Sequence, residues 1–366
     1  MQYPNLYIHV PFCIRKCDYC AFYSVQNQNP AVFTEWLKGI TRQLEEHSAE
    51  LQRLKTLYFG GGTPSILPLP VLKQLFQNIN QFCSFLPDAE ISMEANPETV
   101  TPQLVETVAP FINRVSMGVQ SFHPALRKAA GRYTGSADDA VNAVNLWKSG
   151  GIHNIGLDLL YALPGETLDD FKNDLEQALA LPIRHLSCYS IIPEEGTPFY
   201  QTGYEPDDDL SADMWDFAGD FLADHNMPRY EISNYAQPPY RAKHNWNVWH
   251  GESYLGLGPS AASFNGIDRW TEVPSLEQWL AGVPPEVDHI ERKIRLREIF
   301  LMGLRTVEGW EKKAFTEATE AKADFPELKP LLTRGWLVEQ DGWIRPTKAG
   351  LTYWNEIGVE LLDISN

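Results

Sequence analysis

The sequence predicts an α/β protein in which a partial β/α barrel of six parallel strands is followed by a smaller α+β domain. Two observations lead to this prediction. In the first two thirds of the chain, short runs of β-branched, aromatic and other apolar residues alternate with longer amphipathic runs, as in parallel sheets whose strands are joined by helices. Residues able to hold a polar ligand follow each of the six strand-like runs, as they do at the carboxyl end of a β/α barrel.

The six expected strands all mix β-branched, aromatic and other apolar residues. They cover residues 6–10, 56–59, 91–95, 114–119, 154–161 and 185–191. The helical runs between them repeat apolar residues at a spacing of three and four. Examples are residues 71–82, 102–111 and 138–151, the last closed by two glycines. The acidic stretch Asp207 to Asp209 is interpreted as a solvated helix start with no chemical role.

We expect the barrel to span residues 1–235 and the second domain residues 236–366, because 366 residues are enough for two domains. The last part of the chain opens at Glu291 with a helical run, IRLREIFLMGLRT, and continues with two strand-like runs around Asp341 and Gly342. An Asp-Gly pair between apolar runs is a strong hairpin signal. We therefore expect a winged-helix-like C-terminal domain.

Three cysteines, Cys13, Cys17 and Cys20, lie close together in the run CIRKCDYC directly after the first expected strand. Thiolate is the soft ligand that iron–sulfur clusters select, and one short loop can supply three corners of a cluster. The next position at which a fourth cysteine could follow is Phe22. One iron would then stay open for an exchangeable ligand, which indicates chemistry rather than electron storage alone.

Two alternatives for this loop stay open: a structural zinc site completed by His9 or a distant group, and buried or disulfide-bonded cysteines. Zinc sites pair two such cysteines with a second pair of ligands, and the sequence contains no such second half. Cys83 and Cys188 lie in apolar runs and are interpreted as small core residues. Five cysteines, an odd number, fit a reducing compartment.

Composition excludes other classes of protein. We find no apolar run of 18 residues and no basic-then-apolar leader, so we expect a cytoplasmic protein without a membrane-spanning segment. The formal net charge is −18. Nucleic-acid affinity depends largely on a surplus of Lys and Arg facing phosphates, so nucleic acid is not an expected partner.

The run LYIHVPFCIRKCDYCAF, together with GGGTP at residues 60–64 and SMGVQSF at residues 116–122, resembles the radical S-adenosylmethionine (SAM) superfamily. Within it, the chain resembles the oxygen-independent coproporphyrinogen III oxidase family, and in particular its shorter branch of HemW-type haem chaperones. The resemblance covers nearly the whole chain. It implies a 4Fe-4S cluster held by the three cysteines and SAM bound through its amino and carboxylate groups at the open iron. One electron delivered to the sulfonium would then yield a deoxyadenosyl radical.

The glycine run and Glu94 are the strongest candidates for contacts with SAM. The run GGGTP could be a flexible turn, but glycines also let backbone groups approach a ligand closely, and in the family this loop holds the methionine part of SAM. Glu94 ends an apolar strand and would be costly to bury without a cation, which SAM would supply. Arg132 could instead be a surface residue. The strand-end pattern and the resemblance together imply a SAM site of Tyr7, Tyr19, Gly61, Gly62, Thr63, Glu94, Gln120, Arg132, Asp158 and Ser190.

A block rich in aromatic residues and glycine covers residues 230–264 and contains His244, Asn245 and His250. Packing within a loop layer is the default interpretation. The alternative is a surface facing haem or a porphyrin substrate, since imidazole is a common haem ligand. The chain departs from its relatives here, with Val248 in place of a usual tyrosine and Ala262 in place of a frequent histidine.

Three functions therefore stay open. The resemblance favours a chaperone that binds haem and passes it to an acceptor protein, because the oxidase carries a fourth cysteine at the position of Phe22 and a longer N-terminal extension. The first alternative is an oxidase that converts the propionates of coproporphyrinogen III to vinyl groups. The second is radical modification of another substrate. Each needs an electron donor, and the sequence assigns no catalytic residue.

Overall fold

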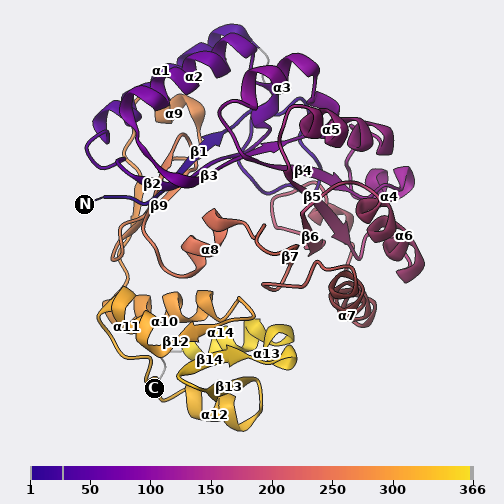
Figure 1. Ribbon diagram of the computed structural model, residues 1–366, viewed down its shortest axis with the longest axis vertical. Helices are drawn as coiled ribbons and strands as arrows, with labels where there is room; N and C mark the ends of the chain where they lie inside the picture. The colour runs from indigo at the N-terminus through magenta and orange to yellow at the C-terminus, as the bar shows by residue number, and fades with distance from the viewer. Residues whose placement is uncertain (1, 27–28, 363–366) are drawn as a thin grey trace.

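The computed structural model describes residues 2–26 and 29–362. Figure 1 shows a curved sheet with helices along its outer side and a smaller C-terminal group of elements beyond α8. The order of hydrogen-bonded strands in the large sheet is β11-β10-β9-β8-β1-β2-β3-β4-β5-β6-β7. The strands from β1 to β6 are neighbours in chain order and pair in parallel, so the predicted partial barrel is confirmed.

All six predicted strands are present, five within two residues of the expected bounds and the third beginning six residues earlier than expected. They are β1 (Asn5–Val10), β2 (Leu54–Gly61), β3 (Phe85–Ala95), β4 (Arg114–Gln120), β5 (Asn154–Tyr161) and β6 (His185–Ser190). Two groups of short strands widen the sheet at its edges. They are β7 (Asn234–Ala236) beside β6, and β8 (Tyr254–Leu257), β9 (Ala262–Phe264), β10 (Arg269–Thr271) and β11 (Glu286–Asp288) beyond β1.

The helices associated with the barrel mostly pack apolar residues against the sheet, except α8, whose one buried residue is His244. They are α1 (Pro30–Glu46), α2 (Leu69–Phe82), α3 (Pro102–Val108), α4 (Pro124–Ala129), α5 (Ala137–Ser149), α6 (Leu168–Leu179), α7 (Asp208–Asp224), α8 (Lys243–Trp249) and α9 (Leu276–Leu280), with short 3-10 turns η1 (Pro64–Ile66), η2 (Pro97–Thr99) and η3 (Tyr200–Thr202). Several begin at a side-chain cap. Asp207 accepts from the backbone N–H of Leu210 at the start of α7, so the expected acidic helix start is confirmed.

The C-terminal part has a three-stranded antiparallel sheet packed with helices. Its elements are α10 (Arg292–Gly303), β12 (Trp310–Glu311), α11 (Lys312–Thr319), α12 (Leu328–Thr333), β13 (Leu337–Gln340), β14 (Trp343–Pro346), α13 (Lys348–Thr352) and α14 (Trp354–Leu362). Asp341 and Gly342 join β13 to β14 with φ values of 51° and 80°, as a tight hairpin turn requires. The predicted hairpin is therefore confirmed.

Two main hydrophobic clusters divide the interior. The larger lies between the sheet and the helices from α1 to α7 and includes Trp36 and Trp147, both fully buried. The second centres on Phe300 and Phe315 of the C-terminal part and also includes Phe264. Residues 254–288 thus extend the large sheet and also contact the second cluster. The expected domain boundary at residues 235 and 236 stays a prediction.

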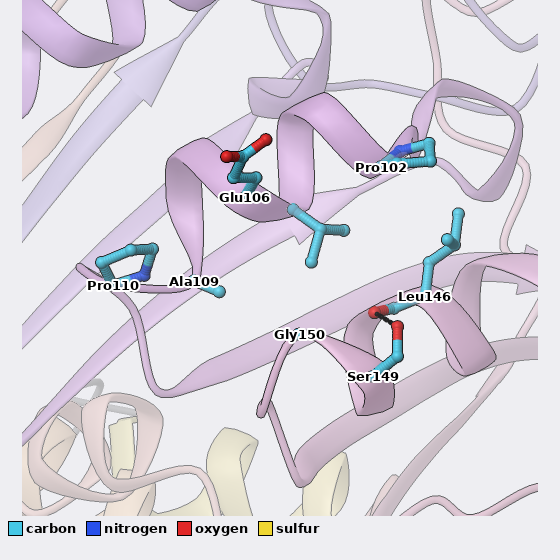
Figure 2. A pocket seen from close by; sticks show the side chains of 8 residues that line it. Pro102, Glu106, Ala109, Pro110, Leu146, Ser149 and Gly150 are labelled. Carbon is cyan, nitrogen blue, oxygen red and sulfur yellow. Dashed lines mark hydrogen bonds between the residues drawn. The ribbon is translucent and has the colours of Figure 1, made fainter.

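An open groove of about 450 Å³ lies outside the barrel between α3 and α5 (Figure 2). Its walls include Val105, Glu106 and Leu146. It lies in the helical layer, away from the strand ends that carry the polar residues. In the part of the chain that the structure describes, none of the helices is both long and apolar enough to span a membrane.

Candidate metal and cofactor site

The cysteine loop follows β1 and folds back on itself through backbone hydrogen bonds. The N–H of Cys13 donates to the carbonyl of Val25 at 3.1 Å, and the N–H of Val25 donates to that of Pro11 at 2.6 Å. The fully buried Phe12 packs edge-on against Phe33, with ring centroids 4.6 Å apart. The start of the loop is therefore fixed by the core of the barrel.

The far side of the loop is held by two other segments of the chain. The N–H of Asp18 donates to the carbonyl of Gly131 at 3.2 Å, and the carbonyl of Asp18 accepts from the N–H of Phe199 at 2.9 Å. The hydroxyl of Tyr133 also donates to the Asp18 carboxylate at 2.8 Å. The turn that carries Cys17 and Cys20 is thus anchored by protein contacts.

The thiols of Cys13, Cys17 and Cys20 are free and interact with one another through their charges. Burial raises the pKa of the Cys13 and Cys20 thiols, and a nearby Cys17 thiolate raises both pKa values further. Metal binding requires the thiolate form, so a positively charged iron–sulfur core would favour deprotonation of this set. Among the described residues, His, Cys, Asp and Glu side chains do not converge closely enough to form a site for a single metal ion. A three-thiol loop with a larger cluster fits this donor set.

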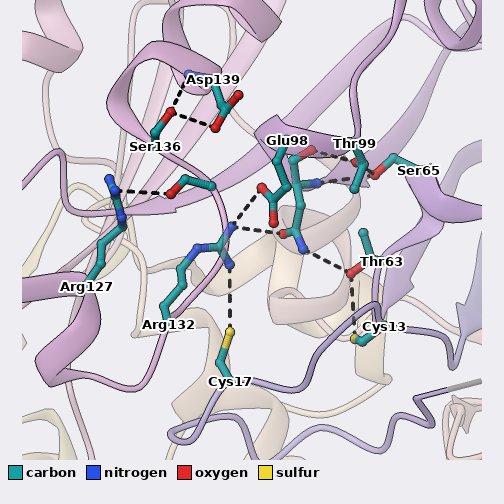
Figure 3. Close-up of polar contacts among 12 residues, drawn as sticks. Cys13, Cys17, Thr63, Ser65, Glu98, Thr99, Arg127, Arg132, Ser136 and Asp139 are labelled. Carbon is teal, nitrogen blue, oxygen red and sulfur yellow. Dashed lines mark hydrogen bonds and ion pairs between the residues drawn. The ribbon is translucent and has the colours of Figure 1, made fainter. Parts of the chain in front are cut away.

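A chain of polar contacts joins two of the cysteines across the strand-end loops (Figure 3). The guanidinium of Arg132 lies 3.8 Å from Cys17 Sγ and 3.4 Å from Asn96 Oδ1. The amide of Asn96 donates to Thr63 Oγ1, whose hydroxyl lies 3.6 Å from Cys13 Sγ. Arg132 is buried and also pairs with Glu98 at 3.5 Å, so the interpretation of Arg132 as a surface residue is wrong.

The glycine run packs closely against His9 and the backbone at the start of the cysteine loop. Gly61 has a φ of 108°, and a Cβ there would lie 2.5 Å from the His9 ring. A Cβ on Gly62 would lie 2.6 Å from the carbonyl oxygen of Phe12. His9 itself is held by the Tyr7 hydroxyl at 3.1 Å and the Tyr23 carbonyl at 3.0 Å. Glycine is therefore required here by space as well as by conformation.

Glu94 lies beside this glycine run. Its carboxylate accepts from the Tyr58 hydroxyl at 2.8 Å and from the Gly61 N–H at 3.2 Å. Burial raises the pKa of Glu94 to about 7, although both hydrogen bonds favour the ionised form. A carboxylate in this position gains stability from a bound cation.

Asp158 and Gln120 approach from the next two strands. Asp158 accepts from the Ser116 hydroxyl at 3.2 Å, and burial raises the pKa of Asp158. Gln120 follows a register shift between β4 and β5 and has a φ of 66°, which is uncommon for a residue other than glycine. Its side-chain oxygen is buried and has no hydrogen-bond partner among the described residues. Such an unsatisfied group is suited to a ligand donor.

The remaining predicted residues divide into two groups. Tyr19 lies near Cys17 and Arg132, whose charges act on the pKa of its hydroxyl after the larger effect of burial. The alternation of β6 places Ser190 on the same side as Cys188, which belongs to the outer core. The structure thus brings Tyr7, Tyr19, the glycine run, Glu94, Gln120, Arg132 and Asp158 to the strand-end region, whereas Ser190 makes no described contact with them.

The histidines of the aromatic block lie on α8 and at its C-terminal end, with the His244 ring 5.2 Å from that of Tyr58. His244 is 6% exposed, and its Nδ1 lies 2.7 Å from the Thr56 hydroxyl of β2. His250 stacks on Trp246 with ring centroids 4.4 Å apart and meets Trp310 edge-on at 5.0 Å. Asn245 is half-buried on α8 between them in sequence. This block therefore connects the barrel to the C-terminal part.

Sequence reasoning missed Tyr58, Glu98 and Ser116, which position Glu94, Arg132 and Asp158 respectively. A signal for Tyr58 and Ser116 was available, because each points to the same side of its strand as another polar residue two positions away. Glu98 carries no such signal, since it lies in a short 3-10 turn.

Comparison with known proteins agrees with this arrangement. The sequence model of the Radical SAM superfamily matches residues 7–178, and that of the HemN C-terminal domain matches residues 290–353. The chain is 32% identical to the "Heme chaperone HemW" of Bacillus subtilis over 96% of this chain and 97% of that protein. It is also 32% identical to the HemW of Escherichia coli over 96% of both chains.

The chain belongs to the HemW family of radical SAM proteins. Its fold matches that of the E. coli coproporphyrinogen III oxidase HemN, with a TM-score of 0.85 and 21% identity over 99% of this chain and 91% of that one. At this identity the likeness is one of fold. The radical SAM family implies a 4Fe-4S cluster and SAM. The three free thiols of the cysteine loop and the unsatisfied Gln120 oxygen fit these groups.

Proposed function

We propose that this HemW-family protein is a haem chaperone, which binds haem and transfers it to an acceptor protein. The observation that carries the proposal is the match at 32% identity to relatives named "Heme chaperone HemW" along nearly their whole length. Phe22 supports it, because a side chain that is 69% exposed stands where the related oxidase carries a further cysteine.

The cluster would be held by Cys13, Cys17 and Cys20 as its protein ligands. When bound, it supplies an electron for the SAM sulfonium. A three-thiolate site needs a reducing compartment, which supports a cytoplasmic location. An electron donor is a further expected partner.

SAM would lie between the glycine run and the carboxylates of the barrel. The backbone of Gly61, Gly62 and Thr63 would contact the amino-acid part of SAM. Glu94 would balance the positive charge of SAM. Gln120 has a free oxygen for a donor on the ligand. Arg132 would orient the ligand from the cysteine side, where it already contacts Cys17.

For haem ligation we propose His250 rather than His244. Burial lowers the pKa of both histidines, so both rings are neutral at pH 7, as iron ligation requires. His244 is nearly inaccessible and held by Thr56 at 2.7 Å. His250 Nε2 faces the Gly309 carbonyl at the longer distance of 3.4 Å, and Trp246 and Trp310 beside it supply flat apolar area.

One experiment separates the chaperone from the oxidase. The cluster is reconstituted without oxygen, and the protein is incubated with SAM, a reductant and coproporphyrinogen III in one arm and titrated with haem in the other. We expect tight haem binding and no decarboxylated product. Decarboxylated product without haem binding would overturn the proposal in favour of the oxidase.

A further inference from the structure

Arg114 opens strand β4 and is one of the most deeply buried charged residues of the barrel, with 2% of its side chain exposed. Its Nε has no hydrogen-bond partner, and the guanidinium forms no ion pair within 4.0 Å, in residues 2–26 and 29–362. A buried charge without a direct partner is costly. Its role must therefore lie in the charges that it faces across the barrel.

Strand register places Arg114 on the interior face. Side chains alternate along a strand, so Arg114, Ser116 and Gly118 share one face of β4. The Ser116 hydroxyl donates to Asp158, which identifies that face as the inside of the barrel. Ser116 is paired with Glu94 of β3, and Gly118 with Asp158 of β5. Along this face, Arg114 thus lies one side-chain step from the level of Glu94 and two from the level of Asp158.

A third carboxylate on the same side of β3, Glu90, lies two positions before Ser92, the register partner of Arg114, and is occupied by other donors. Its oxygens accept from the backbone N–H groups of Lys243 and His244, at 3.0 and 3.1 Å, and from the Ser92 hydroxyl at 3.2 Å. Glu90 therefore caps the start of α8. Its charge is also the largest of those that raise the pKa of Arg114 against the effect of burial.

The other titratable groups around Arg114 in the described chain are neutral or acidic. They are Tyr58 of β2, Glu90 and Glu94 of β3, Asp158 of β5, His185 of β6, Tyr230 before β7 and His244 of α8. Burial lowers the pKa of His244 to about 3 and that of His185 well below its usual value, and the charge of Arg114 lowers both further. Of the groups in this set, Arg114 is the one with a positive charge at pH 7.

The effect of that charge reaches both candidate ligands of the SAM cation. Burial raises the pKa of Glu94 and of Asp158, and the positive charge of Arg114 opposes the rise in each. Without it, a larger fraction of both carboxyl groups would be protonated at neutral pH.

We propose that Arg114 is a positioning residue, a fixed buried cation that keeps Glu94 and Asp158 negatively charged for a cationic ligand. This inference rests on the proposed function, since it takes SAM as that ligand. Arg114 itself does not touch the ligand. Its positive charge acts, from inside the barrel, on the two carboxylates.

The test measures the dissociation constant of SAM for the cluster-loaded protein by equilibrium dialysis at pH 6.5, 7.5 and 9.0. Arg114→Met should weaken SAM binding by up to about tenfold at pH 6.5 and by about threefold at pH 7.5 relative to the parent, because a rise of about one pKa unit reduces the ionised fraction most at a pH below the pKa. At pH 9.0 the affinity of the variant should be nearly that of the parent, because both carboxyl groups ionise again. Arg114→Lys should keep near-parental affinity at each pH.

Arg295→Met is the matched control. Arg295 is also buried, at 4% exposed, but lies on α10 and pairs with Glu298. The control should destabilise the fold without a pH-dependent loss of SAM binding. If Arg114→Met does not fold, adding Asp158→Asn should restore folding, since it removes the charge that Arg114 balances. Failure of that rescue would overturn the inference.

An equal loss of affinity at every pH, or no loss, would also overturn this inference. The parent protein would still bind SAM in that case, so the proposed function would stand. A parent protein that fails to bind SAM would overturn the proposed function itself, and this inference with it. The two failures are therefore distinguishable.

Discussion

The guanidinium of Arg132, on the segment between α4 and α5, lies 3.8 Å from the sulfur of Cys17, on the loop after β1. Arg132 also pairs with Glu98, so the cysteine loop is tied to the strand-end region by a buried cation (Figure 3). The geometry of the cysteine loop is therefore largely set by the protein.

Changing Cys13, Cys17 or Cys20 to Ala should remove the visible iron–sulfur absorption and most of the bound iron, because three thiolates leave no spare ligand. Absorbance and iron content after anaerobic reconstitution check this. Cys83→Ala and Cys188→Ala are the matched controls, since both thiols are buried outside the loop. Loss of the cluster in either control would contradict the three-ligand hypothesis.

Gly61→Ala should lower the free energy of unfolding by about 1–3 kcal/mol more than Gly165→Ala, measured by urea denaturation. Both glycines have a positive φ, but a Cβ on Gly165 meets nothing within 4 Å, whereas one on Gly61 meets the His9 ring at 2.5 Å. The difference between the two variants isolates the steric effect. Adding His9→Ala should recover part of it, and no recovery would contradict the steric explanation.

SAM affinity should rise with pH through about 7. Glu94 is protonated below its pKa of about 7, and only the ionised carboxylate attracts the SAM cation, so affinity falls by up to about tenfold per pH unit below that value. Tyr58→Phe removes a hydrogen bond that favours the carboxylate, so the midpoint should move to higher pH. Binding measured from pH 6 to 8 checks both effects.

Glu94→Gln should bind SAM weakly and without this pH dependence. Glu106→Gln, an exposed glutamate on α3, is the control and should behave like the parent. A Glu94→Gln protein with the parent's pH profile would assign the titration to another group.

The strands, the hairpin and the cysteine loop could be predicted because their signals are local: alternating apolar residues, an Asp-Gly pair, and three thiols within eight positions. The contacts of Arg132 and His244 could not. Arg132 meets Cys17 across 115 positions of the chain, and His244 meets Thr56 across 188. Such pairs arise from barrel closure, and sequence spacing does not encode them. The edge strands from β7 to β11 were missed because each has only three or four residues, too few for a periodic pattern.

His250→Ala should abolish the Soret shift that accompanies haem binding, whereas His244→Ala should retain it. His250 lies between two indole rings at the junction of α8 and the C-terminal part. Its Nε2 contacts the Gly309 carbonyl at the long distance of 3.4 Å, so binding iron would break only a weak hydrogen bond. His244 is buried, and its Nδ1 forms a hydrogen bond with the Thr56 hydroxyl of β2. A haem titration followed by absorbance, with thermal unfolding of each variant as the folding control, checks the prediction. Loss of the shift in His244→Ala alone would assign ligation to His244. An unchanged spectrum in both single variants and in the double variant would move the haem ligand to another residue, with His9 the next to test because its ring lies at the strand ends beside Gly61.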